Sequence, residues 1–498
     1  MVNPLILVTF LPLAGVPVLL FLNSQQKTAI RWTALATSLL TFGLSFWVLA
    51  LFDRTNPNLQ LLIQTPWLRL PNLEITFALG VDGLSLLMVL LTVFLTPIAI
   101  LSTWSAVQEQ VKGFMLFFLL LEVGMNGVFL AQDMVLFYVF WEFTLIPMIF
   151  LIGIWGSGRR IYAAIKFFLF TMAGSVLMLL GILYIAWQAH TTYLPWLAAN
   201  RALFASAQIW LFMVFGIAFA IKVPLFPLHS WLPDAYVDAP TAGSVILAGV
   251  MAKMGAYGFL RFNLPLFPQA TMILSPWLAL LAVVSILYGA IIAFSQKDLK
   301  KLVAYSSISH LGFVILGIFA LTNQGLSGAV LQMVNHGLST GGLFLITGML
   351  YERRNRRELA AFGGLWKVMP LLGSLTLIIV LSSAGLPGLN GFVGEFTILL
   401  GAFGSQLFAG SWMAGIGALG VILAAVYLLY MFEKAFLGPI TQSENRILPD
   451  LGTREILTLL PVLILIFWIG LYPKPFFELI NPTLEQLAKV VLAAAVGR

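Results

Sequence analysis

Long apolar segments separated by short polar connections make up almost the whole chain. Segments of about 20 apolar residues are long enough to cross the hydrocarbon core of a bilayer as helices. The pattern therefore predicts an all-α polytopic membrane protein. We expect fourteen transmembrane segments, at residues 4–22, 31–52, 80–105, 112–130, 133–155, 162–188, 206–222, 241–262, 271–294, 301–321, 325–350, 369–400, 412–436 and 454–472.

The first apolar segment reads as a retained helix. A second segment follows it at once, and no small-residue cleavage site lies between them, so a signal peptide is not expected. The polar intervals are short connections, which leaves no room for a separate soluble domain.

Composition supports the same class. Hydrophobic residues make up 60% of the chain and charged residues 9%, with a mean hydropathy of +1.00. A soluble domain has about 45–50% apolar and about 25% charged residues. Cysteine is absent, which excludes disulfides, thiolate-bound iron–sulfur clusters and cysteine-bound zinc from this polypeptide.

Basic residues are distributed unequally between alternate connections. Connections after even-numbered segments hold four, Arg54, Arg69, Arg201 and Arg261. By the positive-inside rule, both termini are expected on the non-cytoplasmic side. The net charge of +7 thus reflects topology and not nucleic-acid binding. Connections after odd-numbered segments hold 16: Lys27, Arg31, Lys112, Arg159, Arg160, Lys297, Lys300, Lys301, Arg353, Arg354, Arg356, Arg357, Lys367, Lys434, Arg446 and Arg454.

Lys222 ends an apolar run, and three prolines follow it. Residues 206–221 carry no charge, and Pro224, Pro227 and Pro233 come next. A lysine at membrane depth costs about 2.5–3.5 kcal/mol on insertion scales, so it needs a partner or a wet path. Proline removes a backbone donor and clashes with the preceding turn. We expect a broken helix just beyond Lys222, which membranes tolerate only inside protein or along a cavity.

Four further charges are flanked by apolar residues on both sides and are not explained by topology: Glu122, Glu142, Lys253 and Glu395. Any one of them could reach an interface or form a structural ion pair. Together with Lys222 they supply acids and bases that exchange protons through water, which favours a proton relay. Glu142 is the hypothesised charge partner of Lys222.

The second half of the chain contains a faint echo of the broken segment. Residues 216–232 are matched by LSSAGLPGLNGFVGEF at 381–396, where Pro387 follows an apolar run and Glu395 lies beyond it. Corresponding interrupted segments are typical of transporter cores. Glycine and proline are common in membrane helices, so chance is an equal explanation of this one similarity.

The four histidines stand in different sequence contexts. His310 and His336 lie in apolar segments and are candidates for proton transfer, since imidazole titrates near neutral pH. His229 lies just past the predicted break and is expected to cap or line an entrance, while His190 stands in a polar stretch. No segment carries two histidines, which argues against a membrane haem. A satisfied interior role is the alternative for each.

At these residues the chain resembles a known family, the antiporter-like subunits of respiratory complex I. Within it, the chain is most similar to the branch that contains subunit M of bacterial NADH-quinone oxidoreductase and chain 4 of the cyanobacterial and plastid NAD(P)H-plastoquinone oxidoreductase. Glu395, where sister subunits carry lysine, and the lack of a long lateral helix support that branch. The matching segments are GVDGLS (80–85), FYVFWEFTLIPM (137–148), KVPLFPLHSWLPDAYVDAPTAGSVILAGVMAKMGAYG (222–258), SQKDLKKLVAYSSISHLGF (295–313) and LPGLNGFVGEF (386–396).

The resemblance implies two inverted five-helix repeats, each with a broken helix. The domains would be N-terminal helices at 1–111, repeats at 112–262 and 271–436, and a C-terminal helix and tail at 437–498.

It also implies a proton relay. Glu142 would pair with Lys222, Lys253 would be the central lysine, His310 and His336 would bridge through water, and Glu395 would exchange protons toward the next subunit. Glu122 would be a further buried glutamate. Asp238 departs from the family pattern and receives no proton role, and Lys166 is expected to be an interface anchor.

The implied function is proton translocation, coupled to redox chemistry in other subunits. Without a nucleotide loop of useful spacing or cluster ligands, this chain is expected to hold no cofactor. Iron–sulfur clusters, nucleotide and quinone sites would lie in partner subunits. The expected location is a bacterial plasma membrane or a thylakoid membrane, beside other antiporter-like subunits. An Mrp-type cation/proton antiporter subunit, a membrane-bound hydrogenase subunit and a purely structural role remain alternatives.

Overall fold

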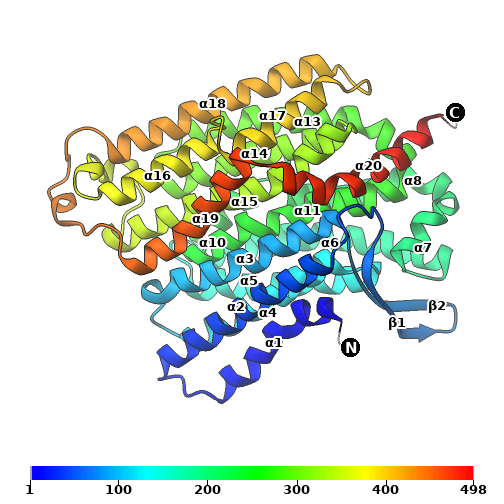
Figure 1. Ribbon diagram of the computed structural model, residues 1–498, viewed down its shortest axis with the longest axis horizontal. Helices are drawn as coiled ribbons and strands as arrows, with labels where there is room; N and C mark the ends of the chain where they lie inside the picture. The colour runs from blue at the N-terminus through cyan, green and yellow to red at the C-terminus, as the bar shows by residue number, and fades with distance from the viewer. Residues whose placement is uncertain (1–2, 497–498) are drawn as a thin grey trace.

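Helices form wherever the sequence is continuously apolar, and most of them lie side by side in one bundle (Figure 1). The computed structural model describes residues 3–496. The helices are α1 (Pro4–Phe21), α2 (Lys27–Leu51), α3 (Gly83–Ala106), α4 (Val111–Leu130), α5 (Met134–Trp155), α6 (Arg160–Ala189), α7 (Leu194–Ala199), α8 (Gln208–Lys222), α9 (Trp231–Asp238), α10 (Thr241–Ile246), α11 (Ala252–Gly258), α12 (Leu264–Leu266), α13 (Pro268–Phe294), α14 (Leu299–Phe319), α15 (Asn323–Arg354), α16 (Pro370–Ser383), α17 (Asn390–Phe403), α18 (Gly410–Phe436), α19 (Thr453–Leu471) and α20 (Lys474–Val496).

The predicted all-α membrane class is confirmed. Within residues 3–496, 13 helices are long and apolar enough to cross a membrane, or up to 14 when a bent pair counts as one. The expected segment at 369–400 is divided into α16 and α17, each of 14 residues.

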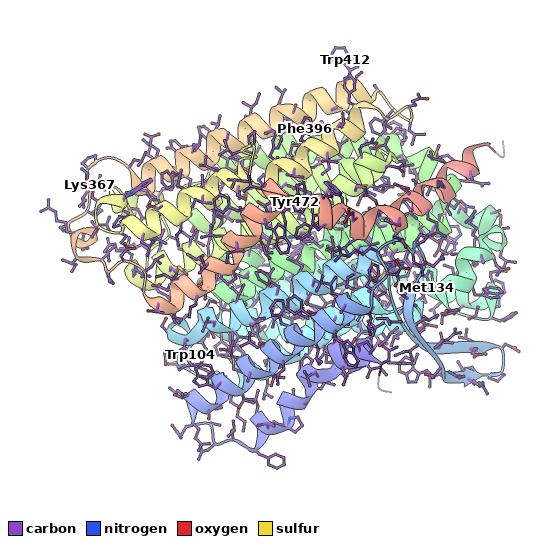
Figure 2. The ribbon with its side chains drawn as sticks, viewed as in Figure 1. Trp104, Met134, Lys367, Phe396, Trp412 and Tyr472 are labelled. Carbon is purple, nitrogen blue, oxygen red and sulfur yellow. The ribbon has the colours of Figure 1, made fainter. Side chains whose placement is uncertain are left out.

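The most buried spans form the centre of the bundle. The apolar windows of the α10–α12 span and of α15 are 100% buried, and that of α14 is 94% buried. Outer helices such as α18 expose apolar side chains, and Trp412 points away from the bundle (Figure 2). An apolar exterior suits lipid, whereas polar side chains in the central spans must find partners within the protein.

The predicted break beyond Lys222 is present. α8 ends at Lys222, and residues 223–230 turn before α9 begins at Trp231. Proline at 224 and 227 cannot donate the backbone hydrogen bonds that would continue the helix. The Trp231 indole instead donates to the Ile221 carbonyl at 2.9 Å, which satisfies one of the free carbonyls at the end of α8.

A second break separates α16 from α17, in the place of the echo at 381–396. Gly385 and Gly388 have φ values of +78° and +93°, a left-handed conformation that side chains with a Cβ atom rarely adopt. Pro387 lies between them. Both halves of the chain therefore carry an interrupted helix.

The central span that carries Lys253 is not a regular α-helix. π-Helical turns at η2 (Leu247–Met251) and η3 (Phe259–Asn263) lie on either side of α11. Such turns widen the helix and are frequent at functional sites.

Two elements were not expected from the apolar pattern. β1 (Gln60–Leu70) and β2 (Leu73–Val81) form an antiparallel hairpin that projects from one end of the bundle (Figure 1). The 23-residue helix α20 follows the last predicted span, where only a tail was expected, and crosses the bundle in Figure 1.

An ion pair fastens the GVDGLS segment to the central span. Asp82 caps α3 by accepting from Ser85 N at 3.0 Å, and its carboxylate lies 2.7 Å from Arg261 in η3. Arg261 also donates to the Tyr257 hydroxyl at 3.0 Å. The pair therefore positions the span that holds Lys253.

Candidate proton relay

Lys222 lies at the end of α8 with a buried ammonium that has no hydrogen-bond partner among the described residues. Its Nζ is 4.9 Å from the centroid of the Trp141 ring and 5.8 Å from that of Phe167. Aromatic faces attract cations through the ring quadrupole. These rings thus supply part of the stabilisation that a carboxylate would otherwise provide.

Glu142 follows Trp141 on α5 but does not touch Lys222. No oxygen of Glu142 lies within 4.0 Å of the Lys222 ammonium, and Glu142 Oε1 has no partner among residues 3–496. A direct ion pair between the two is therefore absent from this conformation, in which Trp141 lies beside the ammonium. Coupling between the two charges stays a prediction.

Lys253 and His336 are in direct contact at the centre of the bundle. Lys253 Nζ and His336 Nδ1 are 2.6 Å apart, and both side chains are buried. Lys253 also donates to the carbonyl of Ala248, five residues earlier in the π-helical turn. A protonated lysine can donate to the imidazole, so this pair can share or pass a proton.

His310 and Glu395 form a second contact. His310 Nδ1 lies 2.7 Å from Glu395 Oε1, which also accepts from Gln332 Nε2 at 3.0 Å. The Tyr427 hydroxyl lies 3.2 Å from His310 Nε2. Both ring nitrogens of His310 are thus engaged, one of them by a carboxylate that can accept or return a proton.

The two contacts are separated by a short gap. The ring centroids of His310 and His336 are 6.0 Å apart. A cavity of about 10 Å³ lies beside both rings and is lined by polar groups, including Asn335 and Ser383. That volume is about the minimum for one water molecule. His336 Nε2 and Ser383 Oγ have no protein partner among the described residues, so both could bond to such a water.

Glu122 stays outside this chain of contacts. It is fully buried on α4, and neither carboxylate oxygen has a hydrogen-bond partner among the described residues. The structure therefore joins Lys253, His336, His310 and Glu395, and leaves Glu122, Glu142 and Lys222 apart from them.

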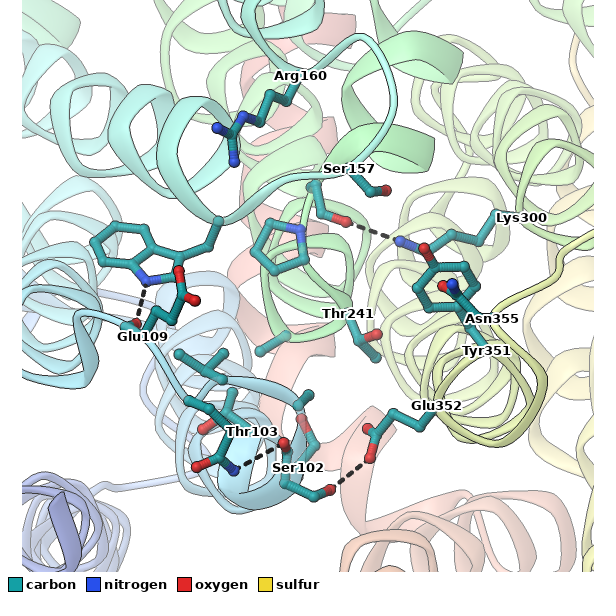
Figure 3. A pocket seen from close by; sticks show the side chains of 18 of the residues that line it. Ser102, Thr103, Glu109, Ser157, Arg160, Thr241, Lys300, Tyr351, Glu352 and Asn355 are labelled. Atoms are coloured by element: carbon teal, nitrogen blue, oxygen red, sulfur yellow. Dashed lines mark hydrogen bonds between the residues drawn. The ribbon is translucent and has the colours of Figure 1, made fainter.

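A large cavity opens on the side of the bundle where basic residues are frequent (Figure 3). Its volume is about 660 Å³. Arg160 lies on one side and Glu352 on the other, with Lys300 and Tyr351 along the wall (Figure 3). Such a cavity brings water close to α9 and α10.

Lys300 holds the end of α9, a role that sequence reasoning missed because Lys300 was counted only for topology. It is buried and donates to the carbonyls of Ala239 at 2.8 Å and Val237 at 3.3 Å. Arg357 donates to the same Val237 carbonyl at 3.0 Å and lies 3.9 Å from Asp238. Burial raises the pKa of the Asp238 carboxyl, and Arg357 opposes that rise. Cations are favoured where a helix exposes carbonyls.

Lys166, which was predicted to be an interface anchor, forms an ion pair within the protein. Its Nζ lies 2.7 Å from Asp234 on α9, and Arg159 lies 3.5 Å from the same carboxylate. Asp234 was not singled out from the sequence, although it stands in the HSWLPDA stretch just past the break. His229 lies within the break, with its ring centroid 4.9 Å from that of Tyr288. His190 is exposed and bonds to the Asn72 carbonyl.

Comparison with protein families gives a match over the region that contains this site. The family described as NADH:quinone oxidoreductase/Mrp antiporter, transmembrane, matches residues 131–423. The chain belongs to this family. The matched residues of this antiporter family include every candidate relay residue except Glu122.

Curated relatives extend the similarity over the full chain. NADH-quinone oxidoreductase subunit M of Rhodobacter capsulatus is 42% identical, covering 98% of this chain and 97% of the relative. The subunit M of Rickettsia typhi is 43% identical over 97% of this chain and 98% of that relative. NADH-ubiquinone oxidoreductase chain 4 of Marchantia polymorpha is 41% identical over 96% of both chains. The chain is thus a subunit of the complex I type.

Solved structures share the fold. A chain of respiratory complex I from Thermus thermophilus matches with a TM-score of 0.86 and 34% identity, covering 98% of this chain and 99% of that one. A chain of the archaeal membrane-bound sulfane sulfur reductase matches with a TM-score of 0.84 at 25% identity, over 94% and 76% of the two chains. A Dietzia Mrp complex chain at 23% identity, covering 98% of this chain and 51% of its own, shows the fold alone (TM-score 0.81).

Proposed function

We propose that this chain is a proton-translocating membrane-arm subunit of a complex I type NAD(P)H or ferredoxin:quinone oxidoreductase. The observation that carries the proposal is the chain of contacts Lys253–His336 and His310–Glu395 across one cavity of about 10 Å³. These groups lie in the most buried part of the described bundle, where unpaired polar side chains are expensive.

Protons would move along this chain by transfer between neighbouring groups. Lys253 would give a proton to His336, a water molecule would carry it to His310, and Glu395 would receive it. Each group can both accept and release a proton, and the contact distances of 2.6 and 2.7 Å are within hydrogen-bond reach. Glu395 would then release the proton toward the next subunit.

The broken helix would supply the control. Lys222 would approach Glu142 in one state and lie over Trp141, as observed here, in another. A ligand or charge shifts such an equilibrium only through different interactions with the two states. Moving one charge across the membrane requires about 2.3 kcal/mol per 100 mV, so an external driving force is needed. Glu122 would be a further proton-exchanging carboxylate.

Redox chemistry would take place in partner subunits. This polypeptide would hold no redox centre, with iron–sulfur clusters, nucleotide and quinone sites in other subunits and antiporter-like subunits as neighbours. The two repeats would occupy 112–262 and 271–436, between the N-terminal helices (1–111) and the C-terminal region (437–498). The charge bias would place both termini on the non-cytoplasmic side of a plasma or thylakoid membrane.

Sodium/proton antiport is the second candidate, since an Mrp complex chain shares the fold. Purification of the complex separates the two. Co-purifying iron–sulfur subunits and quinone-dependent proton uptake into proteoliposomes would support the proposal, and sodium-driven proton movement without quinone reduction would contradict it. Reduction by hydrogen would instead indicate a membrane-bound hydrogenase.

The decisive variant for the relay is Glu395→Gln, which keeps the shape of the side chain but removes its titration. We expect loss of quinone-coupled pumping in assembled complexes. Glu433→Gln, at an exposed carboxylate, is the matched control.

A further inference from the structure

An apolar groove on the outside of the bundle is not used by the proposed relay. Its volume is about 280 Å³. Figure 1 shows α19 and α20 crossing the bundle on the side of α2 and α3, with α15 behind them. The lining is almost entirely aliphatic and aromatic: Phe42, Phe46 and Leu49 from α2, Leu87, Leu90, Leu91 and Phe94 from α3, Val334 and Leu338 from α15, Leu465, Trp468 and Ile469 from α19, and Pro475, Phe476 and Leu479 from α20.

The groove opens toward the lipid side of the bundle. Phe46 is 51% exposed and Trp468 is 49% exposed, whereas Leu338 and Ile469 at the inner wall are fully buried. The chain turns between Leu471 and Lys474, so α19 and α20 approach the groove from different directions. Trp468 and Phe476 meet edge to face across this turn, 5.4 Å between ring centroids. An open apolar cavity on the outer surface of a membrane-spanning bundle suits acyl chains.

Within the part of the chain that the structure describes, Arg54 is the one charged side chain that lines the groove. It is exposed, and among the described residues it makes no hydrogen bond or ion pair. The neighbouring Asp53 carboxylate accepts from Thr55 N at 2.9 Å and Thr55 Oγ1 at 2.7 Å and does not pair with Arg54. Arg54 also stands in a connection on the side where basic residues are few, so the positive-inside rule does not explain it.

We propose that this groove is a binding site for an anionic phospholipid, with one acyl chain in the groove and the phosphate at Arg54. The guanidinium presents several donors in a planar fork that suits two phosphate oxygens. The apolar wall gains stability with each methylene that it covers. This inference concerns lipid binding and does not depend on proton transfer.

The inner wall of the groove belongs to the helix that carries His336. Val334 and Leu338 on α15 face the groove, and they stand directly around Asn335 and His336 in the sequence. His336 points instead to Lys253. A bound acyl chain therefore packs on α15 from the side opposite the relay and restricts displacement of that helix.

Photocrosslinking of the assembled complex tests the site. The probe is phosphatidylglycerol with a photoactivatable group in its acyl chain, supplied in vesicles, with the matching phosphatidylcholine probe in parallel. We expect labelling of peptides from α3, α19 and α20. Unlabelled phosphatidylglycerol should reduce it, and a long-chain quinone should not. Labelling that quinone displaces would assign the groove to a quinone tail and overturn the proposal.

Two variants separate the headgroup from the chain. Arg54→Gln should lower phosphatidylglycerol labelling by about tenfold, as expected for a lost charged hydrogen bond, and lower phosphatidylcholine labelling less, because the choline ammonium offsets the charge of the same phosphate. Leu90→Trp should fill the groove and abolish labelling by both probes. Arg69→Gln, an exposed arginine of the hairpin, is the control. If the wild-type complex is labelled no more than Leu90→Trp, or if Arg69→Gln has the effect of Arg54→Gln, the site is refuted.

Discussion

Lys253 and His336 lie 2.6 Å apart between Nζ and Nδ1 at the centre of the bundle, although 83 residues separate them in the sequence. The Ala248 carbonyl, in the π-helical turn before Lys253, accepts from the same ammonium. No carboxylate lies within 4.0 Å of this lysine among the described residues. Its hydrogen-bond partners are an imidazole and a backbone carbonyl, so gain or loss of a proton by His336 changes the environment of Lys253 directly.

Replacement of His336 by Ala removes the acceptor from Lys253 and the donor to the central cavity. We expect the rate of quinone-coupled proton uptake in proteoliposomes to fall at least about a hundredfold, since a positioned proton carrier contributes that much. His190→Ala is the control, because the His190 side chain is exposed and its ring bonds to the Asn72 carbonyl, outside the proposed relay. Normal pumping by an assembled His336→Ala complex would remove His336 from the relay.

The contacts of Glu395 predict that removal of its charge and loss of a hydrogen bond to it have different effects on proton pumping. Glu395→Gln should abolish pumping, because an amide cannot titrate. Gln332→Leu removes the 3.0 Å hydrogen bond to Glu395, together with the 3.4 Å bond that Gln332 Oε1 accepts from Asn335, and should shift the pH dependence of pumping while activity is retained. Initial rates of proton uptake between pH 5 and pH 9 provide the comparison. Identical profiles for Gln332→Leu and the wild type would show that this hydrogen bond does not tune Glu395.

The sequence predicted features of the site that depend on neighbouring residues, but not those that depend on the packing of distant helices. The prolines after Lys222 predicted the first break, because proline acts on its own turn. The contact between Lys253 and His336 could not be predicted from composition or spacing, since it depends on the packing of two distant helices. Glu142 was predicted as the charge partner of Lys222, from its charge and from the family resemblance. In the structure the Trp141 ring lies beside the ammonium instead.

The hairpin and α20 show a related limit. A search for long apolar segments finds transmembrane helices but not strands. β1 contains Gln64, Pro66 and Arg69, which lower its hydropathy, so the sequence pattern placed it in a connection between two segments. Its stability comes from pairing with β2 and from Asp133, whose carboxylate accepts from Thr76 and Thr192. α20 mixes Glu478, Glu485 and Lys489 with apolar positions, a pattern of a surface helix and not of a span.

The buried pair of Asp82 and Arg261 predicts a loss of stability. Asp82→Asn leaves Arg261 without its counter-charge, and breaking such a pair costs about 3–5 kcal/mol. We expect a lower thermal unfolding temperature of the purified complex, with Asp53→Asn, at an exposed carboxylate, as control. Equal unfolding temperatures for Asp82→Asn and Asp53→Asn would show that the pair is not stabilising.

The same pair predicts the acid limit of stability. Burial opposes ionisation of Asp82, but the charge and hydrogen bonds of Arg261 outweigh it and hold the pKa of that carboxyl below its ordinary value. A lowered folded-state pKa contributes stability above the unfolded pKa of about 3.9, and that contribution disappears as pH falls below it. Wild-type unfolding temperature should therefore decline more steeply below about pH 4 than that of Asp82→Asn. Parallel curves would contradict this assignment.

The hydrogen bonds from Lys300 to the end of α9 predict a defect in the coupling between quinone reduction and proton movement. Lys300→Met removes both hydrogen bonds to the carbonyls of Val237 and Ala239, each worth about 1.5–3 kcal/mol when the donor is charged. We expect quinone reduction to continue with fewer protons moved per electron, since α9 directly follows the break at Lys222. Lys301→Met, at the neighbouring exposed lysine, should keep the wild-type ratio. A wild-type ratio in Lys300→Met would limit Lys300 to a structural role.

Lys222→Ala in the assembled, purified complex shows whether buried charges in this chain move protons. Proton uptake into proteoliposomes and quinone reduction are measured on the same preparation, with Lys434→Ala as the exposed control. We expect Lys222→Ala to lose proton uptake, and quinone reduction to slow with it because the two processes are coupled. Full pumping and full quinone reduction in Lys222→Ala would instead leave this chain with a structural role.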